Sequence, residues 1–267
     1  MLRFISFGSG SSGNCYYLFT DTDALLIDVG VGLRTLKKHF HDYGKRLDSV
    51  HHILITHDHA DHVKSVGSVC RDFRLPVFTT RKVHEGIERN YCVRQKITPA
   101  FVHVIEKATP FTLGEFHVTP FGVPHDCADN VGYKIECEGV VFSLMTDVGH
   151  LTDEMLQVIE ESNYLVIEAN HDKEMLAQGR YPQYLKQRIA GPIGHLSNAE
   201  CAMALAEHAT PNLRHVWLCH LSADNNHPEL ARKTVDQVLR DHGIVIGEEF
   251  DVDVLKRTTP SGIYDLK

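Results

Sequence analysis

The stretch Thr56-His57-Asp58-His59-Ala60-Asp61-His62 follows the apolar run His52-Ile-Leu-Ile and leads into a helix-like run at 62–73. His57 and His59 lie two positions apart, so an extended backbone points both imidazoles to one side. Asp61 and His62 stand at the start of the helix and can turn towards a second ion. A polar surface turn is the alternative, but so many ligand-type side chains directly after a buried strand predict a metal site.

Residues of the same chemistry follow other apolar runs of the sequence. They are Asp28 after Ala24-Leu-Leu-Ile, His125 after 115–121, Asp147 after 140–146 and His220 after Val216-Trp-Leu-Cys. Taken alone, each is more often a structural histidine or a turn aspartate. Strand ends of α/β proteins hold reactive groups on rigid loops, however, and together with the first cluster these residues complete two coordination sets. Imidazole and carboxylate ligands suit zinc, manganese or iron.

The remaining pattern predicts an α/β architecture. Strand-like runs are 2–7, 15–20, 24–29, 51–56, 76–79, 101–105, 115–121, 131–137, 140–146, 163–168 and 214–219. Helix-like runs are 31–43, 62–73, 81–90, 152–161, 182–189, 197–208 and 228–242. This order suits two mixed sheets packed face to face with helices outside. No Pro/Gly/Ser-rich linker divides the chain, so we expect one domain spanning 1–267.

Composition narrows the class of protein. The chain has 267 residues and a formal net charge of −8, so bulk charge does not indicate a nucleic-acid binder and any such contact needs a local basic patch. Its seven cysteines are odd in number and include no C-x-x-C pair, which argues against a disulfide framework and a zinc ribbon. We find no signal segment and no apolar stretch of about 18 residues, which predicts a cytoplasmic protein with no membrane partner.

The ligand order resembles that of a known family. Asp28, His57-x-His59-x-Asp61-His62, His125, Asp147 and His220 resemble the metal-binding order of the metallo-β-lactamase superfamily, over almost the whole chain. Four further motifs resemble the bacterial YycJ/WalJ group: Gly8-Ser-Gly-Ser-Ser-Gly-Asn14, Glu168-Ala-Asn-His-Asp172, Gly194-His-Leu-Ser-Asn198 and Leu221-Ser-x-x-Asn-Asn226. The resemblance implies a four-layer αββα sandwich and, from the group, exonuclease activity on DNA.

Carried over position by position, the resemblance implies a site for two divalent metal ions. His57, His59 and His125 would hold the first ion, Asp61, His62 and His220 the second, and Asp147 would bridge them. Zinc is the favoured ion, with manganese or iron as alternatives. Ions about 3.5–4 Å apart would clamp an in-line displacement at phosphorus, with a metal-bridging hydroxide as nucleophile. Asp28 would orient the ligands or the 57–62 turn; a plain turn aspartate is the alternative.

Further residues are assigned to catalysis and substrate binding. Besides Asp61, the catalytic candidate is His195, which resembles a histidine beside the leaving group in related phosphodiesterases and could protonate a departing alkoxide. Packing at a helix start capped by Ser197 or Asn198 is the alternative. The substrate-binding candidates are Ser11, Ser12, Asn14 and Asn226.

Segment 71–98 carries seven basic and three acidic residues, net +4, and Tyr181–Arg188 mixes aromatics with bases. Either could contact nucleic acid or be an ordinary helix face.

Phosphodiester hydrolysis is the leading interpretation, with nucleic acid as substrate and DNA favoured over other phosphodiesters. A thioester hydrolase of the glyoxalase II type shares the metal motif and is the main alternative, along with other small-molecule metallohydrolases. A β-lactam hydrolase is disfavoured because no export signal is present and the second ion has a fuller ligand set. A non-catalytic metal-binding module is disfavoured because the ligand set is complete.

Overall fold

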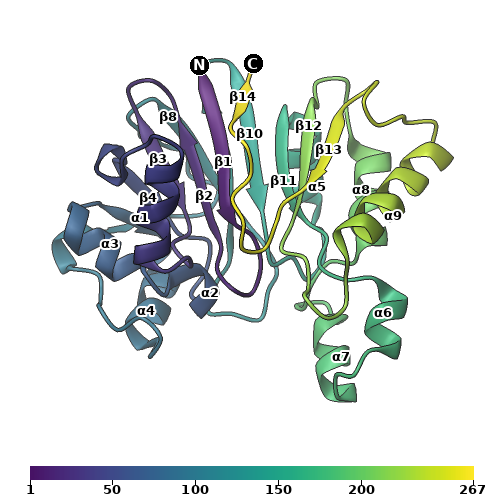
Figure 1. Ribbon diagram of the computed structural model, residues 1–267, viewed down its shortest axis with the longest axis horizontal. Helices are drawn as coiled ribbons and strands as arrows, with labels where there is room; N and C mark the ends of the chain where they lie inside the picture. The colour runs from purple at the N-terminus through teal and green to yellow at the C-terminus, as the bar shows by residue number, and fades with distance from the viewer.

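Two seven-stranded sheets form the centre of the molecule (Figure 1). The computed structural model describes residues 1–267. The first sheet has the order β14 (Tyr264–Leu266), β1 (Leu2–Gly8), β2 (Cys15–Phe19), β3 (Ala24–Ile27), β4 (His52–Leu54), β5 (Val77–Thr79), β6 (Val102–Val104). The second has the order β13 (Asp251–Val254), β12 (His215–Cys219), β11 (Tyr164–Glu168), β10 (Val140–Met145), β9 (Val131–Cys137), β8 (Phe116–Gly122), β7 (Phe111–Leu113). Both sheets mix parallel and antiparallel pairs.

Helices cover the outer face of each sheet. Those beside the first sheet are α1 (Leu33–Asp42), α3 (Val66–Phe73) and α4 (Arg81–Arg89), and those beside the second are α5 (Asp153–Glu161), α8 (Asn198–His208) and α9 (Pro228–Asp241) (Figure 1). Short helices α2 (Ala60–Val63), α6 (Lys173–Gln178) and α7 (Gln183–Ile189) lie at the lower end in this view, and 3-10 turns occupy Leu47–Ser49 and Pro99–Phe101. The predicted four-layer αββα sandwich is confirmed.

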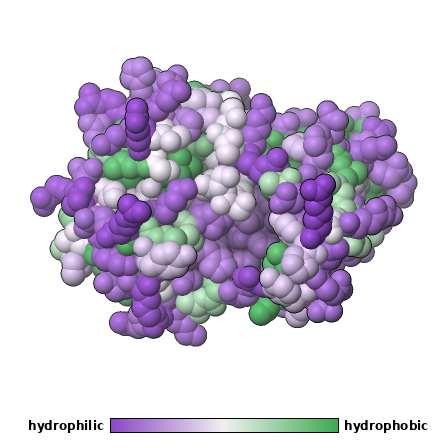
Figure 2. Space-filling view, turned by 60° about the horizontal axis from the view of Figure 1, so that its bottom comes forward, coloured by the Kyte–Doolittle hydropathy of each residue, from purple (hydrophilic) through white to green (hydrophobic).

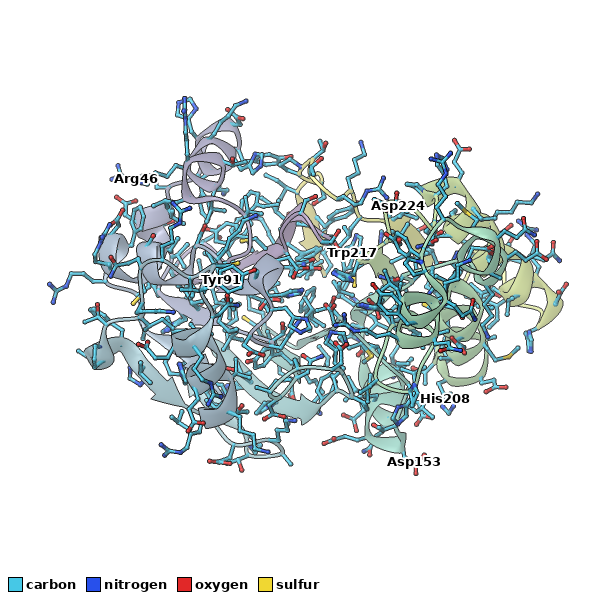
Figure 3. All side chains as sticks on the ribbon, turned by 90° about the horizontal axis from the view of Figure 1, so that it is seen from below. Arg46, Tyr91, Asp153, His208, Trp217 and Asp224 are labelled. Carbon is cyan, nitrogen blue, oxygen red and sulfur yellow. The ribbon has the colours of Figure 1, made fainter.

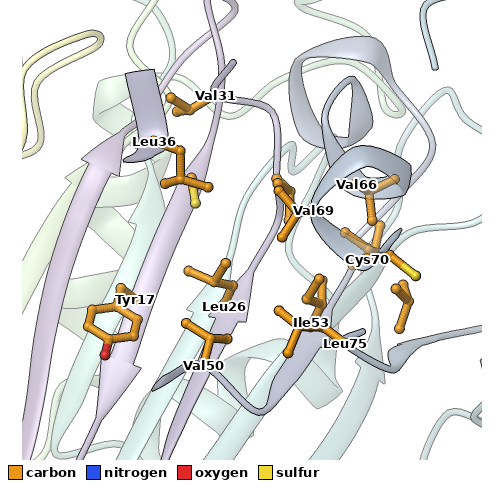
Figure 4. Packing of buried hydrophobic residues seen from close by; sticks show 14 of the residues in the cluster. Tyr17, Leu26, Val31, Leu36, Val50, Ile53, Val66, Val69, Cys70 and Leu75 are labelled. Carbon is orange, nitrogen blue, oxygen red and sulfur yellow. The ribbon is translucent and has the colours of Figure 1, made fainter. Parts of the chain in front are cut away.

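Three apolar clusters separate these layers, and β2 shows how one strand serves two of them. Tyr17 and Phe19 pack in the cluster under the helices of the first sheet (Figure 4), whereas Tyr16 and Leu18 pack in the cluster between the sheets. Successive side chains of a strand point to opposite faces, so a strand buried on both faces is apolar throughout. A third cluster, which includes Met145, packs the second sheet against its helices.

The topology brings the predicted site residues to one edge of the sandwich. The run β3–β4–β5–β6 is parallel, and so is β10–β11–β12–β13, so the carboxyl ends of the strands in each run share an edge. Asp28, Asp147 and His220 follow β3, β10 and β12 with φ of 62°, 57° and 54°. This left-handed backbone costs a non-glycine residue about 1–3 kcal/mol and concentrates at functional sites.

The structure differs from the sequence-based elements at a few places. The predicted helix 62–73 is two helices, α2 and α3, because Ser65 donates its backbone N–H to Val29 O at 3.0 Å instead of continuing the helical ladder. Helix α6 and strands β7, β13 and β14 were not predicted; each is six residues or shorter, and most lie at a sheet edge. No helix has both the length and the apolar character to cross a bilayer.

Candidate metal centre

The residues predicted as ligands converge where the two sheets meet at this edge. Ligand atoms of His57, His59 and His125 lie within 4.8 Å of one another, and so do those of Asp61, His62 and His220. Asp147 groups with His57 and His62. Figure 3, seen from below, shows nitrogen and oxygen atoms crowded between the two halves of the molecule. The structure therefore brings together all the predicted ligands, from both sheets.

The first group has the donor atoms that a cation needs. His57 Nδ1 donates to Thr56 Oγ1 at 3.0 Å, and His125 Nδ1 donates to Gly194 O at 3.0 Å. The Nε2 atoms of both histidines are buried and have no hydrogen-bond partner. A buried polar atom without a partner costs about 1–3 kcal/mol. These two nitrogens fit a divalent metal ion, which they would bind as neutral imidazoles.

In the second group a protein acceptor likewise holds Nδ1 of each histidine, but each Nε2 has polar side chains beside it. His62 Nδ1 donates to Asp28 Oδ2 at 2.7 Å, so Nε2 faces the carboxylates of Asp61 and Asp147, at 3.6 and 3.1 Å. His220 Nδ1 donates to Glu168 Oε1 at 2.9 Å, and its Nε2 lies 3.4 Å from Asp61 Oδ2. A protein acceptor on one ring nitrogen fixes the tautomer that leaves the other free for a metal.

Asp147 stands between the two groups. Its Oδ1 lies 3.6 Å from His125 Nε2 and its Oδ2 lies 3.1 Å from His62 Nε2. Burial would raise the pKa of the Asp147 carboxyl, but His220 and His62 hold it well below its usual range. Oδ1 also lies 3.5 Å from His220 Nδ1. One buried carboxylate therefore reaches histidines of both groups, which is what a bridging ligand requires.

Asp28 is a fully buried acceptor. It receives His62 Nδ1–H on Oδ2, while its Oδ1 accepts the Thr56 backbone N–H at 2.8 Å. It therefore contacts a predicted ligand and the start of the 57–62 turn, and these contacts favour the orienting role over a plain turn. Burial lowers the pKa of His62, but the carboxylates of Asp28, Asp147 and Asp61 outweigh this and raise it to about 10.

Glu168 is the buried acid that the sequence did not assign to the site. Its Oε1 accepts from His195 Nδ1 and from His220 Nδ1, both at 2.9 Å, and its Oε2 accepts the backbone N–H of Val148 at 2.7 Å and of Leu196 at 3.1 Å. Burial raises the pKa of Glu168, but His195 and His220 lower it to about 2. Glu168 thus holds both histidines. Its place in the quoted motif 168–172, at the end of an apolar strand, was the available signal.

His195 lines the same pocket as the ligands. With Nδ1 held by Glu168, its Nε2 is left for the pocket, and the ring centroid lies 5.0 Å from that of His125. Burial lowers the pKa of His195, but the carboxylates of Glu168 and Asp147 raise it above its usual value. A histidine in this setting can carry a proton beside the ligands, as a general acid must.

The pocket itself is about 260 Å³ in volume. In Figure 2 this face is hollowed near its middle, and hydrophilic atoms surround the hollow. Arg188, from the segment Tyr181–Arg188 that the sequence offered as a possible nucleic-acid contact, lines the pocket and donates through Nε to Asp126 Oδ2. Asp126, which was not predicted, also lines it, and its Oδ1 lies 3.4 Å from His125 Nε2. Arg188 supplies the pocket with a cationic side chain that is largely exposed. Tyr181 also lines it and donates to Asp224 Oδ2 at 2.6 Å.

The residues predicted to bind substrate lie in different settings. Ser11 is exposed and lines the pocket, and Ser12 is exposed and lines a neighbouring cavity. Asn14 is buried, accepts from the Gly10 backbone N–H at 2.8 Å, and points Nδ2 at His62 Nε2 at 2.8 Å.

Asn226 is buried and its side chain is bonded to the protein on both sides. Its Nδ2 donates to the carbonyls of Ala169 and Asn170 at 2.9 and 3.0 Å, and its Oδ1 accepts from Asn198 Nδ2 at 3.0 Å. These contacts favour a structural role for Asn226 over the predicted contact with substrate.

Comparison with known proteins agrees with this geometry. Residues 24–221 match the family described as a beta-lactamase superfamily domain. The chain is 37% identical over 254 residues to exodeoxyribonuclease YycJ of Bacillus anthracis, covering 94% of each chain. It is 33% identical over 244 residues to exodeoxyribonuclease WalJ of Streptococcus pneumoniae serotype 2 (strain D39 / NCTC 7466), covering 91% of this chain and 90% of that one. The metallo-β-lactamase fold protein YhfI of Bacillus subtilis shares the fold, with a TM-score of 0.71 at 16% identity over 97% of this chain and 98% of that one. The chain belongs to the metallo-β-lactamase superfamily and, within it, to the YycJ/WalJ group.

Proposed function

We propose that this protein is a two-metal hydrolase that cleaves phosphodiester bonds and acts as an exonuclease on DNA. The observation that carries the proposal is the position of Asp147, whose buried carboxylate lies 3.1–3.6 Å from histidines of both groups of ligand-type side chains. The names of the relatives, exodeoxyribonucleases YycJ and WalJ, support DNA as the substrate. One domain over residues 1–267 and a cytoplasmic location stay predictions.

The chain's own residues divide the binding of the ions between them. His57, His59 and His125 would hold one ion, Asp61, His62 and His220 the other, with Asp147 shared. When bound, divalent ions supply Lewis acidity towards water and towards the phosphate oxygens. Zinc suits these nitrogen and carboxylate donors best, and manganese and iron also accept them.

His195 would move the proton that the leaving group needs. Glu168 fixes its orientation through Nδ1 at 2.9 Å and favours the protonated ring, so Nε2–H can be delivered to the departing alkoxide. Arg188, which lines the same pocket, carries positive charge that can meet a non-bridging phosphate oxygen. These groups bind and protonate a phosphodiester, and they favour it over an uncharged thioester.

The test combines metal analysis with a panel of substrates. Purified protein should contain two metal ions per chain and should shorten end-labelled single- or double-stranded DNA, with slower turnover of RNA and of bis(p-nitrophenyl) phosphate. An Asp147→Ala protein purified identically controls for contaminating nuclease. A metal-replete crystal with one ion and with Asp61, His62 and His220 uninvolved would refute the two-metal site. Hydrolysis of a glutathione thioester without nuclease activity would refute the substrate class.

A further inference from the structure

A second cavity adjoins the metal pocket across the Gly8–Asn14 loop. It has a volume of about 280 Å³ and is lined by Phe7, Ser12, Gly13, Val31, Gly32, Thr35, His39, Lys64, Arg257 and Thr258. Ser11 lines the metal pocket, while Ser12 and Gly13 line this cavity, so one loop forms a wall of each. The lining contains two permanent cations and no acidic side chain. We name it the cationic cavity.

The two cations are fixed to the protein through backbone carbonyls and not through carboxylates. Lys64 directly follows α2, the helix that carries Asp61 and His62, and its Nζ donates to Ser12 O at 2.7 Å. Arg257 donates from Nη1 to Ser222 O at 3.1 Å, and neither Lys64 nor Arg257 forms an ion pair with a carboxylate. Both therefore keep their charge uncompensated and have further donors to offer.

Neutral groups complete the lining. The hydroxyls of Ser12, Thr35 and Thr258 are on exposed residues, and His39 has a buried Nε2 without a hydrogen-bond partner. Ammonium, guanidinium and hydroxyl donors around one cavity are the groups that bind phosphate oxygens. These two unpaired cations lie beside the metal pocket of a chain whose net charge is −8, so they form a local positive site on a protein that is negative overall.

We propose that the cationic cavity binds a phosphate group of the polynucleotide while a neighbouring phosphodiester occupies the metal pocket. The proposal rests on the proposed function and deepens it, since it names the feature that separates a polymer from a small phosphodiester. The bound phosphate is either the one at the end of the strand or an internal one. A small aryl phosphodiester fills the metal pocket alone and gains nothing from the cavity.

Thr35 offers the cleanest test because it is an exposed position on α1 that also lines the cavity. Thr35→Glu adds a carboxylate there without removing any contact between the loop and the rest of the protein, and Thr35→Gln adds the same bulk without charge. Arg257→Gln and Lys64→Gln remove the cations themselves. Lys233 is an exposed residue of α9 that lines neither cavity, so Lys233→Gln controls for the loss of one positive charge.

We expect KM for a DNA oligonucleotide to rise about tenfold in Thr35→Glu and Arg257→Gln at low salt, with a much smaller rise for bis(p-nitrophenyl) phosphate. Lys233→Gln should behave like the unmodified protein, and Thr35→Gln, which adds no charge, should raise KM for the oligonucleotide less than Thr35→Glu does. The slope of log KM against log salt concentration should fall by about one when Arg257 or Lys64 is replaced, as for a lost phosphate contact. Melting temperatures identify any variant that fails to fold.

Oligonucleotides with 5′-phosphate, 3′-phosphate or hydroxyl ends separate the two sources of the phosphate. A loss confined to one phosphorylated end assigns the cavity to a terminal phosphate, and an equal loss on all of them assigns it to an internal one. Equal losses on oligonucleotide and aryl substrate, or no effect of Thr35→Glu, would overturn the proposal.

Fluorescence anisotropy measures how tightly the metal-loaded protein binds a nuclease-resistant phosphorothioate oligonucleotide. This assay tests binding at the cationic cavity without cleavage of the substrate. If the unmodified protein cleaves no phosphodiester, the proposed function fails. In that case, weaker binding by Thr35→Glu than by Thr35→Gln still supports the cavity, and equal binding overturns it.

Discussion

Replacing Asp28 with asparagine should take away the acceptor that sets the tautomer of His62. Asp28 Oδ2 accepts from His62 Nδ1 at 2.7 Å, and Oδ1 accepts the Thr56 backbone N–H at 2.8 Å. An asparagine that keeps its oxygen on the Thr56 amide turns its NH₂ towards His62. The imidazole must then accept at Nδ1 and carry its proton on Nε2, the atom that faces Asp61 and Asp147. A protonated Nε2 cannot bind a metal ion.

The size of the effect follows from the hydrogen bond that is lost. A hydrogen bond to a charged group contributes about 1.5–3 kcal/mol, which corresponds to roughly 10–150-fold in an equilibrium constant. Losing an outer partner of a metal ligand typically weakens metal binding by about 10–100-fold. The backbone adds little, because Asp28 has φ 62° and asparagine tolerates this region as aspartate does. We therefore expect the metal Kd to rise about 10–100-fold, chiefly for the ion held by His62.

The assay is competition with a chelating dye, and the chain provides a matched control. Asp23 lies at the other end of β3, is also buried, and accepts from His51 Nδ1 at 2.6 Å and from the Ala24 backbone N–H at 2.8 Å. Asp23→Asn removes the same kind of pair far from the ligands, so both variants should lower the melting temperature and only Asp28→Asn should weaken metal binding. Equal metal affinity in the two variants would refute the tautomer argument.

Three further outcomes are expected. Asp147→Ala should lose the second ion and nearly all turnover, as measured by metal content and DNA cleavage; an active two-metal variant would rule out the bridge. His195→Ala should keep both ions but lose about 10²–10⁴-fold in rate on DNA, and much less on a substrate with a nitrophenolate leaving group; equal losses would remove the acid role. In chelator-treated protein, burial lowers the pKa of His62 but the nearby carboxylates raise it to about 10, so the protonated ring stabilises the fold below pH ~6.5. That stabilisation should disappear as the pH rises towards about 10, and a melting temperature that does not fall over this window would contradict it.

The candidate ligands could be identified from the sequence because their signals are local. His57 and His62 belong to one short motif, and Asp147 and His220 each follow a long apolar strand. Such strands have strong patterns, and the carboxyl ends of parallel strands meet at one edge. Strands β7 (Phe-Thr-Leu) and β14 (Tyr-Asp-Leu), by contrast, are three-residue edge strands without valine or isoleucine. The three-residue edge strand β6 (Val-His-Val) has two valines and was predicted.

Of the groups that support the candidate ligands, Asp28 was assigned from the sequence through the family resemblance, but Glu168 was not, because it acts through contacts between distant segments. Glu168 meets His195 and His220, which are 27 and 52 positions away in the chain. The polar side chain of Asn226 suggested a contact with substrate, but it forms hydrogen bonds with the backbone of 169–170 and the side chain of Asn198. Whether a polar side chain faces a pocket or the protein interior is decided by packing, which a linear pattern does not contain.

The division of the ligands between the two sheets explains why neither half of the chain could form the site alone. The 57–62 turn after β4 supplies two members of each group, and the second sheet completes them with His125 in one and His220 in the other. The packing that sets the distance between these contributions lies directly between the sheets, where Phe4 of β1 meets Trp217 of β12 with ring centroids 4.7 Å apart. Trp217 lies within β12, and His220 is the residue that directly follows this strand. The apolar core and the ligand geometry are therefore coupled through one rigid element, and an ion bound at this edge would be held by both sheets at once.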